Sequence, residues 1–149
     1  MMSELSHLEP FVIQIDAKEW ADRWAENAHK ICFDEMRPSH FNRIDYALII
    51  VNGKNKPAGF CTVKELDHES VYWQYGGAFP DTQGTVWTFR CYEMLLDWTF
   101  NKYKRITTYV HNENIVYLKM IMKFGFRIIG VRFFAGKIYV ELLNERKGE

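Results

Sequence analysis

The stretch that decides the fold is VYWQYGGAFPDTQGTVWTF, residues 71–89. Its first half is rich in aromatic and β-branched residues, which predicts a strand over residues 71–79. Residues 80–84 then form a break with proline and glycine at its ends. The apolar, aromatic-rich segment over residues 85–101 predicts a helix. A strand that leads through a short loop into a helix favours a crossover unit with a parallel partner strand.

Downstream of this stretch, the sequence supplies the partner strand and three further elements. Residues 105–110 are expected to form the parallel strand, and residues 112–124 carry apolar side chains at helical spacing. Gly125 follows as a C-terminal helix cap. Two last strands, over residues 127–134 and 137–143, are joined by a turn at Ala135 and Gly136.

Upstream, the pattern begins with a strand over residues 11–15 and a helix. Asp16, with Glu19 three positions later, predicts the helix cap. A short second helix is expected over residues 34–42. Three antiparallel strands follow over residues 46–51, 58–66 and 71–79, the first two joined by a hairpin at Asn52-Gly53. The resulting order is β-α-α-β-β-β-α-β-α-β-β, which predicts an α/β (α+β) domain with a mixed central sheet and helices on both faces.

Length and composition bound the class of protein. The 149 residues suit a single domain, residues 1–149. Nineteen basic and nineteen acidic side chains give zero net charge, which argues against strong binding to nucleic-acid phosphates. Three cysteines far apart predict reduced thiols and no metal site. The first ten residues lack the pattern of a signal peptide, and no apolar run is long enough to span a bilayer. We therefore expect a cytoplasmic protein without a membrane partner.

Two local motifs match, in spacing and in position along the chain, those of a known protein family. Asn114 is followed eleven and twelve positions later by Gly125 and Phe126, and Gln83-Gly84 opens the long helix. With the order of elements, these residues make the chain resemble the GCN5-related N-acetyltransferases. The order covers almost the whole chain, whereas the motifs cover about 20 residues. The resemblance implies transfer of an acetyl group from acetyl-CoA to an amine acceptor that the sequence does not identify.

The resemblance places the CoA pyrophosphate at the start of the long helix. A helix N-terminus offers unpaired N–H groups and a partial positive charge, so the amides there can cradle an anion. Two positions that hold glycine in the family are Val86 and Thr88 here. The alternative is a plain turn before the helix. The cofactor-binding residues expected in this loop are Gln83, Gly84, Thr85, Val86, Trp87 and Thr88.

Two glycines lie inside the predicted strand ahead of that loop. Gly76 and Gly77 indicate a bulge or a close approach by another chain or a ligand. In the family this stretch separates from the next strand, and the pantetheine arm binds its exposed backbone as an added strand would. The other interpretation is that the glycines relieve crowding among aromatic neighbours. The resemblance adds Gly77, Ala78, Phe79 and Asn114 to the cofactor-binding residues, with an amide near Phe79 for the thioester carbonyl; Asn114 can instead cap its helix.

The proton carriers depart from the family pattern. Ile121 stands where the family commonly has a tyrosine that serves as the general acid, and Tyr117 lies one helical turn earlier. Tyr72 occupies the position of a catalytic glutamate, although a phenol of pKa about 10 suits a proton donor better than a base. His111 ends a strand beside the expected site, and imidazole side chains commonly act as general acids and bases. Tyr72, Tyr117 and His111 are the candidate catalytic residues, with Glu65 and His68 as further candidates for the base.

Two other functions stay open at this point. A nucleic-acid base modifier on the same scaffold needs a basic rim beside the site, so nucleic acid is not excluded as a partner. A module that binds CoA or assembles with a partner without turnover would fit the missing glycines and Ile121. A homodimer also stays open. The basic side chains available for such a rim are Lys102, Lys104, Arg105, Arg127 and Arg132.

Overall fold

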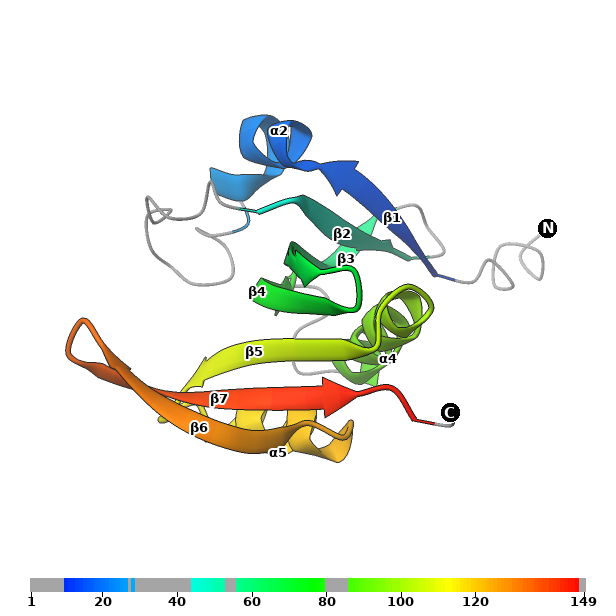
Figure 1. Ribbon diagram of the computed structural model, residues 1–149. Helices are drawn as coiled ribbons and strands as arrows, with labels where there is room; N and C mark the ends of the chain where they lie inside the picture. The colour runs from blue at the N-terminus through cyan, green and yellow to red at the C-terminus, as the bar shows by residue number, and fades with distance from the viewer. Residues whose placement is uncertain (1–9, 27, 29–43, 53–55, 80–85, 148–149) are drawn as a thin grey trace.

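A computed structural model of the chain describes residues 10–26, 28, 44–52, 56–79 and 86–147. Seven strands of this part form one sheet in the order β1-β2-β3-β4-β5-β7-β6. Of the neighbouring pairs, β4–β5 is parallel and the others are antiparallel. Figure 1 shows β1 to β4 in its upper half and β5, β7 and β6 in its lower half. The elements are β1 (Phe11–Asp16), α2 (Ala17–Glu19), η1 (Trp20–Trp24), β2 (Tyr46–Val51), β3 (Pro57–Asp67), β4 (Ser70–Ala78), α4 (Val86–Phe100), β5 (Arg105–His111), α5 (Ile115–Lys123), β6 (Arg127–Phe134) and β7 (Lys137–Glu145).

The mixed sheet and the crossover through α4 confirm the architecture predicted from the sequence. The Asp16 cap is confirmed as well, because its carboxylate accepts the Glu19 amide at 2.7 Å. After that first turn the helix continues as the π-helix η1. The helix α5 begins at Ile115, three residues later than predicted, because the Asn114 amide turns back to the His111 carbonyl. The predicted helix over residues 34–42 lies outside the described residues.

Apolar side chains pack on both faces of the sheet. One core joins β2, β3, β4, β5 and β7 to α4 and α5, and we call this side of the sheet the helical face. A smaller core on the other side joins β1 to β3 with the segment that contains Trp20, Ala25 and Ala28. Over β5, β7 and β6, none of the described helices covers this second side, which we call the open face.

Two turns after α5 use backbone conformations that favour glycine. Gly125 has a φ of +107° and donates to the Met122 carbonyl, which confirms the predicted cap. Ala135 and Gly136 have φ values of +53° and +77°, as expected where the twist of a tight hairpin demands positive φ. These turns fix the entry to β6 and the register between β6 and β7.

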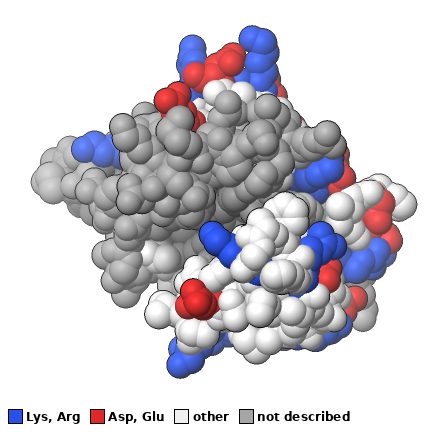
Figure 2. Space-filling view, turned by 90° about the vertical axis from the view of Figure 1, so that its left-hand side faces the viewer, with Lys and Arg blue, Asp and Glu red and all other residues white. Residues whose placement is uncertain are grey.

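The hairpin of β6 and β7 exposes several large apolar side chains. Val131 and Phe133 each leave 69% of their surface in water, and Phe134 leaves 61%. The strand β6 is also an edge of the sheet. Figure 2 views the side of the molecule from which the hairpin projects, where uncharged surface lies among scattered charges of both signs.

Candidate active site

The parallel strands β4 and β5 are joined along only part of their length. Pairing ends where Trp73 stands opposite Thr108, whose hydroxyl donates to the Trp73 carbonyl at 2.9 Å. Beyond this step β4 continues to Ala78 and β5 continues to His111. We call residues 74–78 and 109–111 the parted segment. The separation of these strands, which the resemblance implied, is thereby confirmed.

A β-bulge begins the parted segment. Val63 of β3 pairs with Trp73, and the preceding Thr62 pairs with Tyr75, so Gln74 has no residue opposite it. An extra residue bends its strand and increases the local twist. The bulge therefore turns β4 away from the line that β5 follows.

The placement of the bulge at Gly76 and Gly77 was wrong. These residues pair regularly with Cys61 and Phe60 of β3. The alternative of a close approach fits Gly76, since a Cβ built there would lie 3.3 Å from the Phe60 carbonyl oxygen and 3.9 Å from the Tyr92 hydroxyl. The tight approach is that of the Phe60 carbonyl oxygen, whereas the Tyr92 hydroxyl lies at an ordinary contact distance from the parted segment.

The backbone of the parted segment supplies hydrogen-bonding groups. The Phe79 amide itself donates to the Ala58 carbonyl at 2.9 Å, because the ladder with β3 extends one residue past β4. An amide near Phe79 that faces the thioester must therefore belong to a neighbouring residue. Successive residues in an antiparallel ladder point their N–H and C=O groups to opposite sides. The groups of Ala78 and Gly76 therefore face the side of β5, where those of Tyr109 face back toward β4.

Two tyrosines lie on the helical face of this segment. The rings of Tyr92 and Tyr117 are 5.6 Å apart, and each phenol influences the pKa of the other. Burial, followed by the neighbouring Tyr117, raises the pKa of Tyr92 well above its usual value, and burial raises the pKa of Tyr117 to about 12. Both phenols therefore keep their protons at neutral pH and can act as hydrogen-bond donors. Ile121, at the family's tyrosine position, is a buried core residue.

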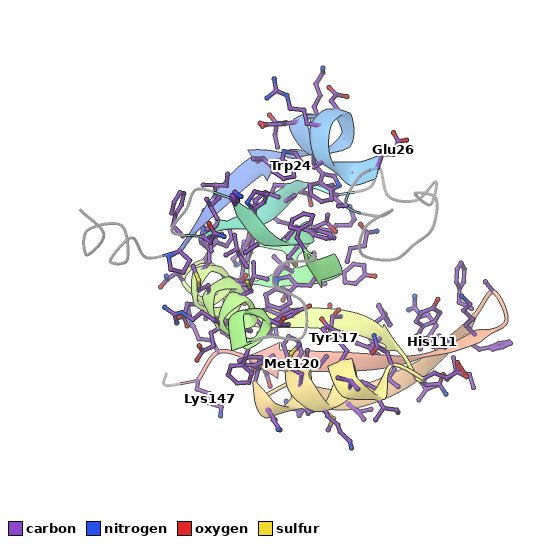
Figure 3. The ribbon with its side chains drawn as sticks, turned by 180° about the vertical axis from the view of Figure 1, so that it is seen from behind. Trp24, Glu26, His111, Tyr117, Met120 and Lys147 are labelled. Atoms are coloured by element: carbon purple, nitrogen blue, oxygen red, sulfur yellow. The ribbon has the colours of Figure 1, made fainter. Side chains whose placement is uncertain are left out.

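In the sequence, Tyr92 is one aromatic residue among several in the predicted helix over residues 85–101. Its helical spacing predicts burial but carries no sign of a functional hydroxyl. Tyr92 belongs to the site because it contacts Tyr117, a residue of another helix, and lies next to the bulged strand. Figure 3 shows Tyr117 on the side of α5 that faces the sheet, with His111 farther toward the β6–β7 hairpin.

A cluster of aromatic and charged side chains occupies the open face at the start of the parted segment. The edge of the Tyr72 ring meets Tyr109 at 5.6 Å between centroids, with an interplanar angle of 87°. The Tyr109 hydroxyl donates to Glu141 at 3.2 Å. The guanidinium carbon of Arg132 lies 4.7 Å from the centre of the Tyr109 ring. Burial, followed by the charge of Glu141, raises the pKa of Tyr109.

His111 stands farther along the open face. Its ring packs edge-on against Tyr139 at 5.6 Å between centroids. Its Nδ1 accepts the Glu113 amide at 3.4 Å, within the turn that leads into α5. The ring therefore helps to shape this turn, and its Nε2 is the nitrogen left for any other contact.

The structure does not gather the three predicted catalytic residues into one cluster. Tyr72 and His111 lie on the open face, whereas Tyr117 lies on the helical face across the sheet. The further base candidates are at the opposite end of β4: Glu65 accepts the Tyr103 hydroxyl, and His68 lies in the exposed turn before β4. This distance from the parted segment excludes direct roles for Glu65 and His68 there.

The helix α4 begins beside the parted segment. Cys91, in its second turn, lies close to Gly59, where a Cβ would be 3.6 Å from the Cys91 sulfur. Gly59 in turn pairs with Ala78 at the end of β4. The second turn of α4 therefore lies beside the end of β4. Burial raises the pKa of the Cys91 thiol to about 11, which makes it a poor nucleophile.

The predicted pyrophosphate loop is described only at its helical end. Val86 and Trp87 form the first residues of α4, and Thr88 is partly buried in the same turn. Gln83, Gly84 and Thr85 lie outside the described residues.

Asn114 occupies the N-cap position of α5, at the end of the turn after β5. Its side chain is exposed and makes no capping hydrogen bond, so the capping alternative is not what the structure has. Its carbonyl accepts the Leu118 amide, which begins the helix. The side-chain amide therefore remains available next to the C-terminal end of β5.

The five basic residues proposed as a rim do not line one site. Lys104 and Arg105 both pair with Glu69 at the far end of β5, and Arg127 pairs with Glu145. Lys102 lies over the Trp98 ring, before β5 begins. Arg132 is the member of the set that reaches the parted segment.

Within the described ranges, no group of three His, Cys, Asp or Glu side chains is arranged to hold a metal ion. None of the helices in this part of the chain is long and apolar enough to cross a membrane.

This sheet, with its crossover helix between two strands that part, is the fold of the GCN5-related N-acetyltransferases. A spermidine/spermine N-acetyltransferase, SpeG from Vibrio cholerae, shares it with a TM-score of 0.70 and 16% identity, over 92% of this chain and 92% of that one. A GNAT family acetyltransferase from Elizabethkingia anophelis, solved with acetyl-CoA bound, gives 0.66 and 15%, over 93% and 99%. An IAA acetyltransferase from Bacillus cereus gives 0.69 and 11%, over 93% and 100%. No family model and no curated protein matches the chain.

Proposed function

We propose that the protein is an acyl-CoA-dependent N-acyltransferase that transfers an acetyl group from acetyl-CoA to an amine by direct attack. The observation that carries this proposal is the parted segment, where backbone groups of both strands face each other unjoined beside the start of α4. Unpaired strand edges bind extended ligands by adding a strand. An amide-rich pantetheine arm is such a ligand, and the nearby helix N-terminus suits its phosphates.

The roles of the cofactor-binding residues follow from their places. The backbone of Gly77, Ala78 and Phe79 belongs to the end of the bulged strand, in which the outward groups of Ala78 meet the pantetheine. The pyrophosphate would bind the amides of residues 83–88, with Asn114 as a polar contact from the other strand.

In the transfer step, the amine nitrogen attacks the thioester carbonyl, a C–N bond forms and the C–S bond breaks. An outward amide of the parted strand, Gly76 or Ala78, would stabilise the negative charge on the carbonyl oxygen. The hydroxyls of Tyr117 and Tyr92 would donate hydrogen bonds to the leaving thiolate from the helical face. The proton that the amine loses passes to water, with Tyr72 and His111 as groups that could hold that water on the open face.

Two variants of neighbouring residues test whether the cofactor binds at the parted segment. Ala78→Pro removes an N–H that faces the parted segment, whereas Phe79→Pro removes one that bonds to β3. Loss of one hydrogen bond corresponds to about tenfold in affinity. We expect Ala78→Pro to weaken acetyl-CoA binding in calorimetry by at least this factor, and Phe79→Pro to lower thermal stability more than Ala78→Pro does. Unchanged affinity in Ala78→Pro would count against this binding site for the cofactor. If acetyl-CoA does not bind the unaltered protein at all, the proposed function is wrong.

A further inference from the structure

Tyr109 holds two opposite charges on the open face without bringing them into an ion pair. Its hydroxyl donates to the Oε2 of Glu141, and its ring carries the guanidinium of Arg132. Arg132 pairs with Tyr139 and Gly130 pairs with Glu141 in the ladder of β6 and β7, so both charged side chains stand on the same face. Among the described residues, neither Arg132 nor Glu141 belongs to an ion pair.

The packing around Glu141 leaves room for its carboxylate. Gly130 lies opposite it, and a Cβ there would be only 3.2 Å from the Oε1 of Glu141. Oε2 is bound by Tyr109, so Oε1 is the oxygen left to accept a donor from outside. The guanidinium of Arg132 likewise uses its face against the ring, which leaves its N–H edge for an anion.

This charge pair lies where an acceptor has to approach. Tyr109 is the first residue of β5 beyond its last step with β4. On the helical face, Tyr92 and Tyr117 and the core behind them fill the space beside the parted segment. The open face is therefore the side from which an amine can reach a thioester held between the strands.

A purely structural role does not account for the arrangement. Arginine and carboxylate side chains on adjacent strands stabilise a sheet best by direct bidentate contact. Arg127 and Glu145, on the same strands and the same face, do form a direct ion pair, from one guanidinium nitrogen to one carboxylate oxygen. At the parted segment the tyrosine ring stands between the two charges instead, and both remain open to a ligand.

We propose that the acceptor is a small amine that also carries a carboxylate, such as a free amino acid. Arg132 binds the carboxylate of the acceptor, and the Oε1 of Glu141 binds its ammonium group. The ammonium releases one proton to water before its nitrogen attacks the thioester carbon. As the C–N bond forms and the C–S bond breaks, the nitrogen loses a second proton through water to the departing thiolate, which leaves as CoA. This inference rests on the proposed acyltransferase function and adds the class of acceptor to it.

The test uses acceptors that differ by one carboxylate. Thiol release from acetyl-CoA is measured with lysine against cadaverine and with phenylalanine against phenethylamine, and spermidine serves as an amine that has no carboxylate. We expect kcat/KM to be at least tenfold higher for each amino acid than for its decarboxylated partner. Arg132→Gln should bring this ratio close to one, mainly through the KM of the amino acid. Arg127→Gln is the matched control and should keep the ratio.

A second readout is binding. In calorimetry with CoA present, the amino acid should bind the unaltered protein and lose at least tenfold in affinity with Arg132→Gln. The inference is overturned if the decarboxylated amines or spermidine react equally well or better, if no amino acid reacts, or if Arg132→Gln leaves the ratio unchanged. Titration of acetyl-CoA alone separates these outcomes from failure of the proposed function, which would show as no cofactor binding at all.

Discussion

The buried hydroxyls of Tyr92 and Tyr117 allow a quantitative test of the interior of the site. If the two neighbouring hydroxyls bond to each other, Tyr117→Phe leaves the Tyr92 hydroxyl buried without its partner. Such a loss costs about 1–3 kcal/mol of unfolding free energy. Tyr92→Phe is expected to cost the same amount, whereas the double variant leaves no hydroxyl stranded. The double variant should therefore lose less than the sum of the single variants, by about 1 kcal/mol or more.

The pH dependence of stability gives the same pair a second signature. The pKa of Tyr117 is about 12 in the folded protein against an ordinary value of 10.0. Because the folded state holds this proton more tightly than the unfolded chain does, its contribution is complete below pH 10 and is lost as the pH rises toward 12. Two pKa units correspond to about 2.7 kcal/mol. Tyr117→Phe should remove part of this decline.

Urea unfolding of the four proteins at pH 8, and of the unaltered protein and Tyr117→Phe from pH 8 to 11.5, measures both effects. Tyr139→Phe is the control, because its ring packs on the open face against His111. Additive single and double losses, together with an identical decline at high pH in Tyr117→Phe, would show that the two hydroxyls are not a coupled buried pair.

Two further predictions concern the C-terminal half of the fold. Gly125→Ala should lower the unfolding free energy by about 1–3 kcal/mol, since φ is +107° and the new Cβ would lie 3.1 Å from the Asn144 side chain. Gly136→Ala, whose Cβ would meet nothing within 4 Å, should cost less in the same thermal unfolding measurement, and a reversed order would refute this reading of the cap. If the exposed hairpin joins two copies of the chain, Val131→Lys with Phe133→Lys should shift sedimentation from dimer to monomer, while a monomer in both proteins would exclude that interface.

Much of the fold could be predicted because its signals are local. The alternation of the strands, the Asp16 cap and the Gly125 cap each depend on residues within a few positions of one another. The crossover over residues 71–110 then follows from the chirality of strand–helix–strand units. The start of α5 was predicted three residues too early, because the turn depends on the hydrogen bond from the Asn114 amide to the His111 carbonyl, which no sequence pattern indicates.

The site was less predictable, since its parts come from separate strands and helices. The two glycines pointed to an irregular strand at the right place in the sequence. The bulge itself is at Gln74, because the register shift between β3 and β4 leaves that residue without a partner in β3. The sequence could place the thioester amide only near Phe79, because register decides which N–H groups pair with β3, and pairing with Ala58 uses that of Phe79. Tyr92 carried no signal beyond helical spacing.

By itself, the sequence determined the order and type of the elements, since hydrophobic period, turns and caps act over short distances along the chain. The tertiary structure alone decided which backbone groups of β4 remain unjoined, which two tyrosines pack together behind them, and that Tyr109 keeps Arg132 and Glu141 apart. Those facts depend on register and on contacts between distant residues, such as Tyr72 with Tyr109 and Tyr109 with Glu141. Such contacts exist only after the sheet has assembled.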